Sequence, residues 1–461
     1  MLAPLLVAVV YNDGDAQAFV KSCVVSGALG AALFVAFRGG PVEVGHREGF
    51  VIVALSWIST VLVSSLPFVF SGVFPSFVDS LFETTSGITT TGASVVSHIE
   101  GLPHGILFWR SMTHWLGGIG IVVLSLAVLP LLGIGGMQLY KSEASVVSAE
   151  KFAPRVKEMA RIIVIVYLVL SFALLVFLVM AGMGIFDAFI HTFGTIATGG
   201  YSDKNISVEY FNNPHIEAVI IVFMVVGATN FSLHYRFFHE GYRVYTRDDE
   251  FRFYVTVMAV ATLVVTFDIA GARFEGFFTA LRHGLFQVVS IMTTTGYSTD
   301  DFGSWPFLSQ MVLFSLMFFG GSAGSTTGAI KCIRLVLLVK IGYREIYRLI
   351  HPHAVAPVKL GGKVIPPEVV SAVMGFTFLY ITVFMVTSLL LTALGLDILT
   401  AISSSAATLG NIGPGLAAAG PASNYAAVPE PGKWLLIFNM LLGRLELYTL
   451  LVLLAPAFWR G

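Results

Sequence analysis

The chain has 461 residues, of which 56% are hydrophobic and only 11% are charged. Soluble domains carry about 25% charged residues, so this composition predicts a membrane protein. The formal net charge of −1 argues against nucleic acid as a partner. The two cysteines, Cys23 and Cys332, form neither a disulfide framework nor a CxxC metal motif, and we interpret both as small packing side chains.

Residues 1–45 are predicted to form an N-terminal helical region. Its first ten residues are apolar, but they lack the basic leader and the cleavage site of a signal peptide. They are also shorter than the roughly 20 residues that span a bilayer. The chain could therefore start inside a first helix, which would leave that helix truncated.

The rest of the chain alternates between long apolar runs and short polar turns. The runs that suit spanning helices are 17–37, 49–70, 104–132, 158–182, 214–235, 253–271, 307–319 with 329–341, 368–394 and 434–456. After the first of them, the runs pair off around four turns rich in threonine and glycine: TTTG at 89–92, ATGG at 197–200, TTTG at 293–296 and TLGNIG at 408–413. Irregular backbone at membrane depth is tolerated only where it is buried in protein or lines a cavity. Four such turns can meet on one axis, where carbonyl oxygens replace the water around a cation.

This pattern predicts an all-α polytopic membrane protein made of four pseudo-repeats around one central pore. Each repeat would be a helix, a short pore helix, a filter turn and a second helix. The predicted repeats are residues 46–140, 150–240, 248–350 and 364–461. Parallel duplication is a common origin of membrane folds.

The spacing before the turns supports a repeat. Asp79, Asp187, His283 and Asp397 each lie 13 residues before a glycine of a turn, namely Gly92, Gly200, Gly296 and Gly410. An aspartate at this place suits the N-cap of a short pore helix. The C-terminus of such a helix would direct its partial negative charge at the ion path.

The basic residues predict the orientation. Nineteen of the 26 lysines and arginines fall at 38–47, 141–161, 236–252, 331–363 and position 460, on the side opposite to the turns. The positive-inside rule makes that side cytoplasmic, so the turns enter from the outer face. The connections on the turn side carry Asp79, Glu100, Asp187, Asp203, Asp300, Asp301 and Asp397. These acids could form an acidic mouth that concentrates cations, or they could be ordinary solvated loop charges.

A cluster of nine small residues, GGSAGSTTG at 320–328, interrupts the apolar run between Met311 and Val339. Each interior glycine costs a helix about 1 kcal/mol relative to alanine, so the helix should break here. A phosphate-binding loop is excluded because Gly328 is followed by Ala329-Ile330-Lys331 and no strand precedes the cluster. A packing surface of small residues is the remaining alternative, although it explains two glycines better than nine consecutive small residues.

Two arginines fall within apolar runs. If the last helix begins near Lys433, Arg444 lies about 16 Å along it at 1.5 Å per residue, close to the middle of the bilayer. A charge there is costly unless it faces a cavity or a partner. Arg444 could face the pore, which we favour, or form a buried pair with Glu83 or Glu446. Arg110 is expected to pair with Glu83 of the first pore helix.

These features together resemble the Trk/Ktr/HKT superfamily of cation transporters. The four turns look like the filters of that superfamily. The segments LGIGGMQLY at 132–140, FGGSAGST at 319–326 and GRLE at 443–446 resemble signatures of its bacterial Trk-type potassium uptake members. The extra N-terminal region favours the TrkH branch over the shorter Ktr branch, and the resemblance covers nearly the whole chain.

The resemblance implies that filter carbonyls bind dehydrated K⁺. The implied positions are Thr90, Thr91, Gly92, Thr198, Gly199, Gly200, Thr294, Thr295, Gly296, Asn411, Ile412 and Gly413. In the fourth turn the 13-residue spacing favours Gly410, whereas the family pattern favours Gly413, which we adopt. Related plant transporters that prefer sodium have serine in the first filter. Gly92 at that position therefore favours potassium.

The resemblance also implies a gate below the filter. The implied gating residues are Gly320, Gly321, Ser322, Ala323, Gly324, Ser325, Thr326, Thr327, Gly328 and Arg444. The arginine would project into the pore and help to hold the loop closed. The family further implies a homodimer with one pore in each subunit, and a TrkA-like cytoplasmic ring that binds nucleotides.

We therefore predict potassium uptake through a gated, channel-like pore in the bacterial inner membrane. No covalently bound cofactor is expected, and a nucleotide would act only through the regulatory partner. The alternatives are a proton- or sodium-coupled potassium symporter and a Na⁺-permeable transporter on the same fold. An enzyme is not expected, because we find no catalytic cluster at membrane depth.

Overall fold

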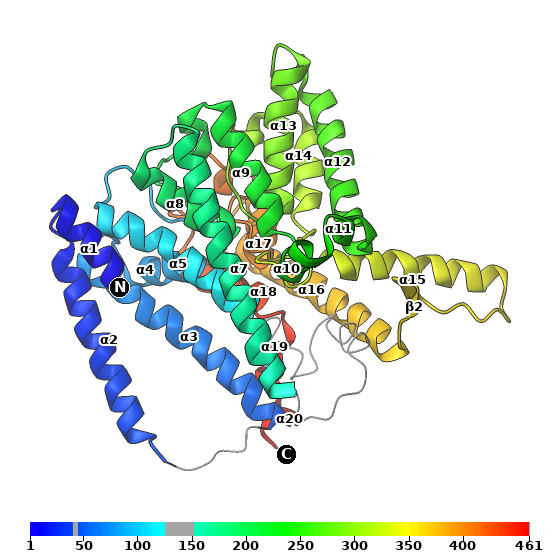
Figure 1. Ribbon diagram of the computed structural model, residues 1–461, viewed down its shortest axis with the longest axis horizontal. Coiled ribbons are helices and arrows are strands. Elements are labelled where there is room, and N and C mark those ends of the chain that lie inside the picture. The colour runs from blue at the N-terminus through cyan, green and yellow to red at the C-terminus, as the bar shows by residue number, and fades with distance from the viewer. Residues whose placement is uncertain (40–44, 125–151, 461) are drawn as a thin grey trace.

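The computed structural model describes residues 1–39, 45–124 and 152–460, and nearly all its regular structure is helical (Figure 1). The segment 132–140 and the basic residues Lys141 and Lys151, singled out above, lie outside the described residues. The N-terminal region forms α1 (Leu2–Tyr11) and α2 (Ala16–Ala36). Helix α1 packs against both α2 and α5.

The remaining elements repeat one order of long helix, short helix, turn and helix. The first set is α3 (His46–Ser71), α4 (Phe77–Ile88) and α5 (His104–Val123), and the second is α7 (Phe152–Met180), α8 (Ile185–Ile196), η3 (Ser207–Phe211), α9 (Pro214–Gly227) and α10 (Phe231–Glu240). The third set is α11 (Arg243–Arg247), α12 (Asp249–Ile269), α13 (Phe277–Met292), η4 (Phe302–Ser304), α14 (Phe307–Leu316) and α15 (Cys332–Ile350). The fourth set is α16 (Pro367–Ala393), α17 (Ile398–Leu409), η5 (Ala417–Ala419), α18 (Glu430–Arg444), α19 (Tyr448–Leu454) and α20 (Pro456–Trp459). Strands β1 (Lys359–Leu360) and β2 (Lys363–Val364) form a small antiparallel hairpin between α15 and α16. The predicted all-α membrane fold is confirmed.

Among the described residues, six helices are long and apolar enough to cross a membrane: α2, α3, α5, α7, α12 and α16. A seventh span is possible if α9 and α10 count as one, but this pair is bent by 96°. The prediction of a continuous span at 214–235 is therefore wrong. Asn230 explains the break, because its side chain accepts a hydrogen bond from the amide of Ser232 and starts a new helix.

The predicted continuous helix at 434–456 is also wrong, because α18 ends at Arg444. Glu446 and Leu447 adopt left-handed backbone angles, with φ of 58° and 51°. Glu446 forms an ion pair with Arg334 of α15, and this contact supports the break. Arg444 thus stands at the end of a helix and not in the middle of one.

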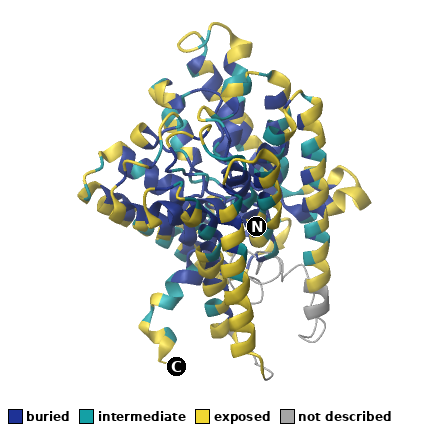
Figure 2. Cartoon of the chain, turned by 90° about the vertical axis from the view of Figure 1, so that its left-hand side faces the viewer, coloured by how far each residue is buried: buried dark blue, intermediate teal, exposed yellow. Residues whose placement is uncertain are grey.

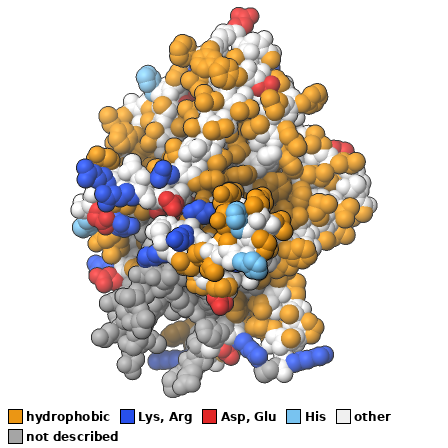
Figure 3. Space-filling view, turned by 90° about the vertical axis from the view of Figure 1, so that its right-hand side faces the viewer, with side chains coloured by type: hydrophobic (Ala, Val, Ile, Leu, Met, Phe, Trp, Pro, Cys, Tyr) orange, Lys and Arg blue, Asp and Glu red, His pale blue; other side chains and the backbone are white. Residues whose placement is uncertain are grey.

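The four short helices lie at the centre of the protein and the long helices surround them. Figure 2 shows the buried residues gathered in the middle of the protein, with exposed residues on the outer helices. Many of those outer residues are large and apolar, such as Phe172, Phe278 and Phe378. On the face drawn in Figure 3, hydrophobic side chains cover most of the surface, and the lysines and arginines gather in its middle and lower parts. An apolar outer surface around a polar centre suits a protein surrounded by lipid.

Candidate functional site

The four turns that follow α4, α8, α13 and α17 share one backbone conformation. One residue of each turn has a left-handed backbone: Thr90, Thr198 and Asn411 have φ of 52° and Thr294 has φ of 53°. The glycine two positions later also has positive φ: 82° at Gly92, 80° at Gly200, 82° at Gly296 and 101° at Gly413. The glycines permit these angles at little cost, whereas the threonines and the asparagine are held there by their surroundings.

The amides of the turns are used in the same way in all four copies. The middle residue, which lies between the left-handed residue and the glycine, donates its N–H to the carbonyl five residues earlier. These bonds run from Thr91 to Ser86 at 2.8 Å, from Gly199 to Gly194 at 2.8 Å, from Thr295 to Ser290 at 2.9 Å and from Ile412 to Ala407 at 2.8 Å. These bonds place Asn411, Ile412 and Gly413 at the positions equivalent to Thr90, Thr91 and Gly92. The fourth turn thus has the alignment adopted from the family pattern.

This alignment explains why the 13-residue spacing misled the prediction of helix caps. Asp397 is the N-cap of α17 and accepts from the amide of Thr400 at 3.0 Å. Helix α4 is instead capped by Ser76, with Asp79 in its first turn, and α8 begins after Gly184, with Asp187 in its first turn. The predictions that Asp79 and Asp187 are N-caps are therefore wrong. In the fourth repeat, the position equivalent to Asp79 and Asp187 lies 13 residues before Gly413 and not before Gly410. That position is three residues after Asp397.

The four turns close into a ring. Each filter glycine is packed so tightly against the next turn that a side-chain carbon on it would collide with the carbonyl of that turn's middle residue. The contacts run from Gly92 to Gly199, from Gly200 to Thr295, from Gly296 to Ile412 and from Gly413 back to Thr91. Only a common axis lets four segments so far apart in sequence touch in this cyclic order.

All but one of the carbonyl oxygens of the ring lack a hydrogen bond from the described part of the chain. Among the residues that the structure describes, none of the carbonyls at 90–92, 198–200, 294–296 and 411–412 accepts a hydrogen bond from the protein. The exception in these turns is the carbonyl of Gly413, which accepts from the hydroxyl of Tyr425 at 2.8 Å. The threonines and Asn411 are almost fully buried. Buried carbonyls are nearly always paired in proteins, so a ring of unpaired ones is an electronegative site that can accept a cation.

The ring opens on one side into a cavity of about 160 Å³. All four filter glycines line it, together with residues of the segments that follow the turns, such as Ser94, Ser202, Ser298 and Pro414. This cavity is a vestibule that leads to the ring.

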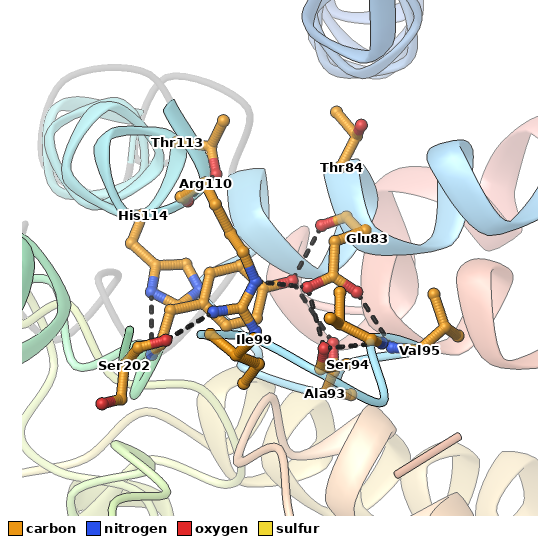
Figure 4. Close-up of polar contacts among 12 residues, drawn as sticks. Glu83, Thr84, Ala93, Ser94, Val95, Ile99, Arg110, Thr113, His114 and Ser202 are labelled. Atoms are coloured by element: carbon orange, nitrogen blue, oxygen red, sulfur yellow. Dashed lines mark hydrogen bonds and ion pairs between the residues drawn. The ribbon is translucent and has the colours of Figure 1, made fainter. Parts of the chain in front are cut away.

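A buried ion pair braces the first turn against the second (Figure 4). Glu83 of α4 accepts from Arg110 Nε at 2.6 Å, from the hydroxyl of Ser94 at 3.0 Å and from the amide of Val95 at 2.9 Å. Arg110 of α5 also donates to the carbonyl of Ser202 at 2.8 Å, beyond the second turn. The predicted pairing of Arg110 with Glu83 is confirmed.

Aromatic packing completes this brace. The Arg110 guanidinium lies 3.6 Å from the centre of the Tyr201 ring, and His114 stacks on the same ring with centroids 4.0 Å apart. The Tyr201 hydroxyl donates to the carbonyl of Glu83 at 2.8 Å. A cation over an aromatic face is favourable, more so when both groups are buried.

Other pore helices use the same position with different chemistry. Glu83 lies nine residues before Gly92, and the residues nine before Gly200 and Gly296 are His191 and Gln287. His191 Nε2 is 3.1 Å from the hydroxyl of Ser202, and Gln287 donates to the carbonyl of Tyr297 at 3.3 Å. Sequence reasoning missed both residues, although counting back from each filter glycine would have found them.

The glycine-rich loop, residues 320–328, lies directly against the ring. The Thr198 hydroxyl of the second turn donates to the Thr326 hydroxyl at 3.1 Å, and the Gly328 amide donates to the Thr294 hydroxyl of the third turn at 2.9 Å. Other loop amides bond to the end of α9: Ser322 to Ala228 at 2.9 Å and Thr326 to Gly227 at 3.3 Å. The break between α9 and α10 frees these carbonyls for the loop.

Arg444 reaches the same loop from α18. Its Nη1 donates to the carbonyl of Thr326 at 2.6 Å. Its Nε and Nη2 are buried and have no hydrogen-bond partner in the described part of the chain. The structure thus pairs Glu83 with Arg110 and Glu446 with Arg334, and it gives neither acid to Arg444.

The side of the loop near Arg444 leaves little room. A cavity of about 20 Å³ lies there, lined by Thr327, Lys331, Glu446 and Arg444 among others. Such a volume holds about one water molecule.

Comparison with known proteins identifies the family. The family described as "TrkH: Cation transport protein" matches residues 15–460. The Trk system potassium uptake protein TrkH of Salmonella typhimurium is 43% identical over 467 residues, covering 100% of this chain and 96% of the relative. The corresponding protein of Vibrio parahaemolyticus is 44% identical over 468 residues with the same coverage. This chain belongs to the TrkH family.

A solved structure agrees with this assignment. The crystal structure of the potassium transporter TrkH from Vibrio parahaemolyticus matches with a TM-score of 0.92 and 41% sequence identity, covering 100% of this chain and 96% of that one. The TrkG protein of Escherichia coli is a more distant relative, at 36% identity over 466 residues, covering 100% of this chain and 95% of the relative.

In the described part of this TrkH-family chain, four of the seven acids near the turns have a basic partner of their own or share one. Three of these carboxylates form close ion pairs: Asp79 with Lys433 at 2.6 Å, Asp203 with Lys204 at 2.8 Å and Asp300 with Arg273 at 2.8 Å. Burial on its own would raise the pKa of Asp300, but hydrogen bonds from Arg273 and Trp305 lower it below the ordinary value. These pairs stabilise the loops beside the turns, and Lys204 is shared with Asp187 at 3.5 Å.

Proposed function

We propose that this protein takes up K⁺ across the bacterial inner membrane through a gated pore formed by one chain. The observation that carries the proposal is the closed ring of four turns with buried, unpaired carbonyls. Relatives at 43% and 44% identity are named potassium uptake proteins, which supports K⁺ as the ion.

In this proposal K⁺ leaves its water in the vestibule and binds the carbonyls of residues 90–92, 198–200, 294–296 and 411–413. Because the amides of each turn point back to its own pore helix, the carbonyl dipoles are free to face the ion. The short pore helices end at the ring, so their C-terminal dipoles add to the negative potential there. A glycine in all four turns, Gly92 included, favours K⁺ over Na⁺.

The glycine-rich loop and Arg444 form the gate. Entry of K⁺ requires the loop to leave its contacts with Thr198, Thr294 and Arg444. The membrane potential supplies the driving force, about 2.3 kcal/mol per charge for each 100 mV. Glu446 approaches the path but is ion-paired with Arg334, so it offers little support for proton coupling.

We extend the proposal to the membrane topology and the assembly. The basic segments face the cytoplasm, and the vestibule faces outward. Two chains associate, each with its own pore, and a TrkA-like ring binds nucleotides and acts on the loop from the cytoplasmic side. Helix α15 supports such contacts because it carries exposed Tyr343, Ile346 and Leu349 beside the exposed Arg348. Chemical cross-linking in native membranes, followed by mass measurement, tests the dimer.

Ion flux into proteoliposomes that contain the purified protein tests the central claim. We expect uptake of K⁺ and Rb⁺ well above that of Na⁺, with a reversal potential that follows the K⁺ gradient. A reversal potential that moves with pH or with the Na⁺ gradient would instead establish coupled symport. Equal fluxes of Na⁺ and K⁺ would establish a Na⁺-permeable transporter. Shortening the 320–328 loop should raise the basal flux, and an unchanged flux would remove its role as a gate.

A further inference from the structure

One side-chain oxygen of Glu250 bonds both to the glycine-rich loop and to the helix that follows it. Glu250 Oε1 accepts a hydrogen bond from the amide of Ala323, inside the loop, at 2.9 Å. The same oxygen accepts from the amide of Ile333, in the first turn of α15, at 2.9 Å. These two amides lie ten residues apart in sequence, on either side of the segment that touches the ring.

Glu250 is placed for this contact by its own helix. It is the second residue of α12, which starts after the N-cap Asp248, and its side chain is buried. The neck of the loop is closed by main-chain bonds from Gly320 to Ile330 at 2.9 Å and from Cys332 to Gly321 at 3.1 Å. Glu250 therefore adds a hydrogen bond from α12 to a loop whose ends are already joined by main-chain bonds.

Glu250 and Arg444 hold different parts of the loop. Arg444 bonds to the carbonyl of Thr326, near the ring, whereas Glu250 bonds to Ala323, on the approach to it. The two contacts come from α18 and α12. Both must break, or move together with their helices, before residues 323–326 can leave the ring.

We propose that Glu250 is a positioning residue of the gate, which latches the glycine-rich loop in its closed position. This inference rests on the proposed function, because it assumes that the loop controls K⁺ flux. One side-chain oxygen of Glu250 accepts from two buried amides, and a buried amide left without its partner is costly. Its removal leaves the Ala323 amide without this partner and favours conformations in which the loop has moved.

The test compares three variants in proteoliposomes without any regulatory partner. Glu250→Ala should raise the basal K⁺ flux about tenfold, the effect expected for the loss of one buried hydrogen bond, with the K⁺ over Na⁺ preference kept. Glu250→Gln should stay close to the unmodified protein, because an amide oxygen can accept from both amides. The matched control is Glu368→Ala, since Glu368 is also the second residue of a spanning helix, α16, but is exposed.

Hydrogen exchange followed by mass spectrometry provides a second readout, and its first part uses the unmodified protein alone. In the unmodified protein the peptide covering 320–328 should be protected, and in Glu250→Ala it should exchange faster while peptides of α4 and α8 do not change. Equal flux in Glu250→Ala and Glu368→Ala would overturn the latch, as would an unprotected loop in the unmodified protein. If the unmodified protein carries no selective K⁺ flux at all, the proposed function fails and not the latch alone.

Discussion

The ring and the glycine-rich loop meet at the centre of the protein, but they are built in different ways. Each turn of the ring is shaped by bonds within its own repeat, such as the amide of Thr91 to the carbonyl of Ser86, and the pattern recurs four times. The loop occurs once, and α9, α12, α18 and two of the turns hold it by unrelated contacts. Local, repeated bonds favour a rigid ring, whereas scattered single contacts allow the loop to be released step by step.

The largest effect is expected from crowding the ring. Gly92→Ala places a carbon against the carbonyl of Gly199, so the first and second turns must move apart and the ring must open. We expect selective K⁺ flux to fall by a factor of about one hundred or more, since a shift of even 1 Å in a preorganised site is this costly. The protein should still fold, because the surrounding helices do not change.

A second glycine separates crowding from backbone strain. Gly271 has nearly the same angle as Gly92, with φ of 79° against 82°, but a side-chain carbon there would meet no atom within 4 Å. Gly271→Ala should cost about 1 kcal/mol of stability and leave flux and selectivity unchanged. Similar flux from the two variants would show that the tight contacts around the ring do not matter.

The next largest effect concerns the brace between the first two turns. Arg110→Gln leaves Glu83 buried without its charged partner, and breaking such a pair typically costs about 3–5 kcal/mol. We expect a clear drop in the thermal unfolding midpoint in detergent, together with weaker selectivity for K⁺ over Na⁺. The double variant Glu83→Gln with Arg110→Gln should recover part of the stability, because no unpaired charge remains.

An exposed ion pair supplies the comparison for the brace. Glu345 pairs with Arg344 on α15, with half of its side chain exposed, and such pairs are worth about 0–1 kcal/mol. Glu345→Gln should therefore barely change the unfolding midpoint. If Arg110→Gln were equally mild, the brace would not support the ring.

The difference between ring and loop also explains what the sequence could predict. Threonine and glycine at four spaced sites are local signals, and they located the turns. The small residues at 320–328 located the break in the helix, and two opposite charges within apolar segments predicted the pairing of Arg110 with Glu83. The helix caps at Asp79 and Asp187 were mispredicted, because equal spacing to Gly410 concealed a three-residue offset in the fourth repeat. The contact of Glu250 with Ala323 joins residues 73 positions apart, and no local sequence pattern predicts it.

The breaks after α9 and after α18 also differ in how far the local sequence predicts them. Asn230 is a recognisable cap signal after Gly227, and closer attention to it would have divided the predicted span at 214–235. Residues 445–447 contain neither glycine nor proline, so nothing local predicts the end of α18 at Arg444. That break depends on the ion pair of Glu446 with Arg334, a contact between separate helices. Tertiary contacts can override helix propensity in this way.

The smallest effect concerns Arg444, where three variants separate its charge from its hydrogen bond. At an effective dielectric constant of about 20, a unit charge close to the path raises the energy of a cation by up to about 4 kcal/mol. If the charge sets the barrier, Arg444→Lys should keep the low basal flux, and Arg444→Gln and Arg444→Met should raise it equally. If the bond to the Thr326 carbonyl dominates, glutamine should leak less than methionine, since it retains an N–H donor. Because Nε and Nη2 have no partner among the described residues, these variants should not lower the unfolding midpoint as Arg110→Gln does. A basal K⁺ flux that stays unchanged in all three would mean that the gate does not depend on Arg444.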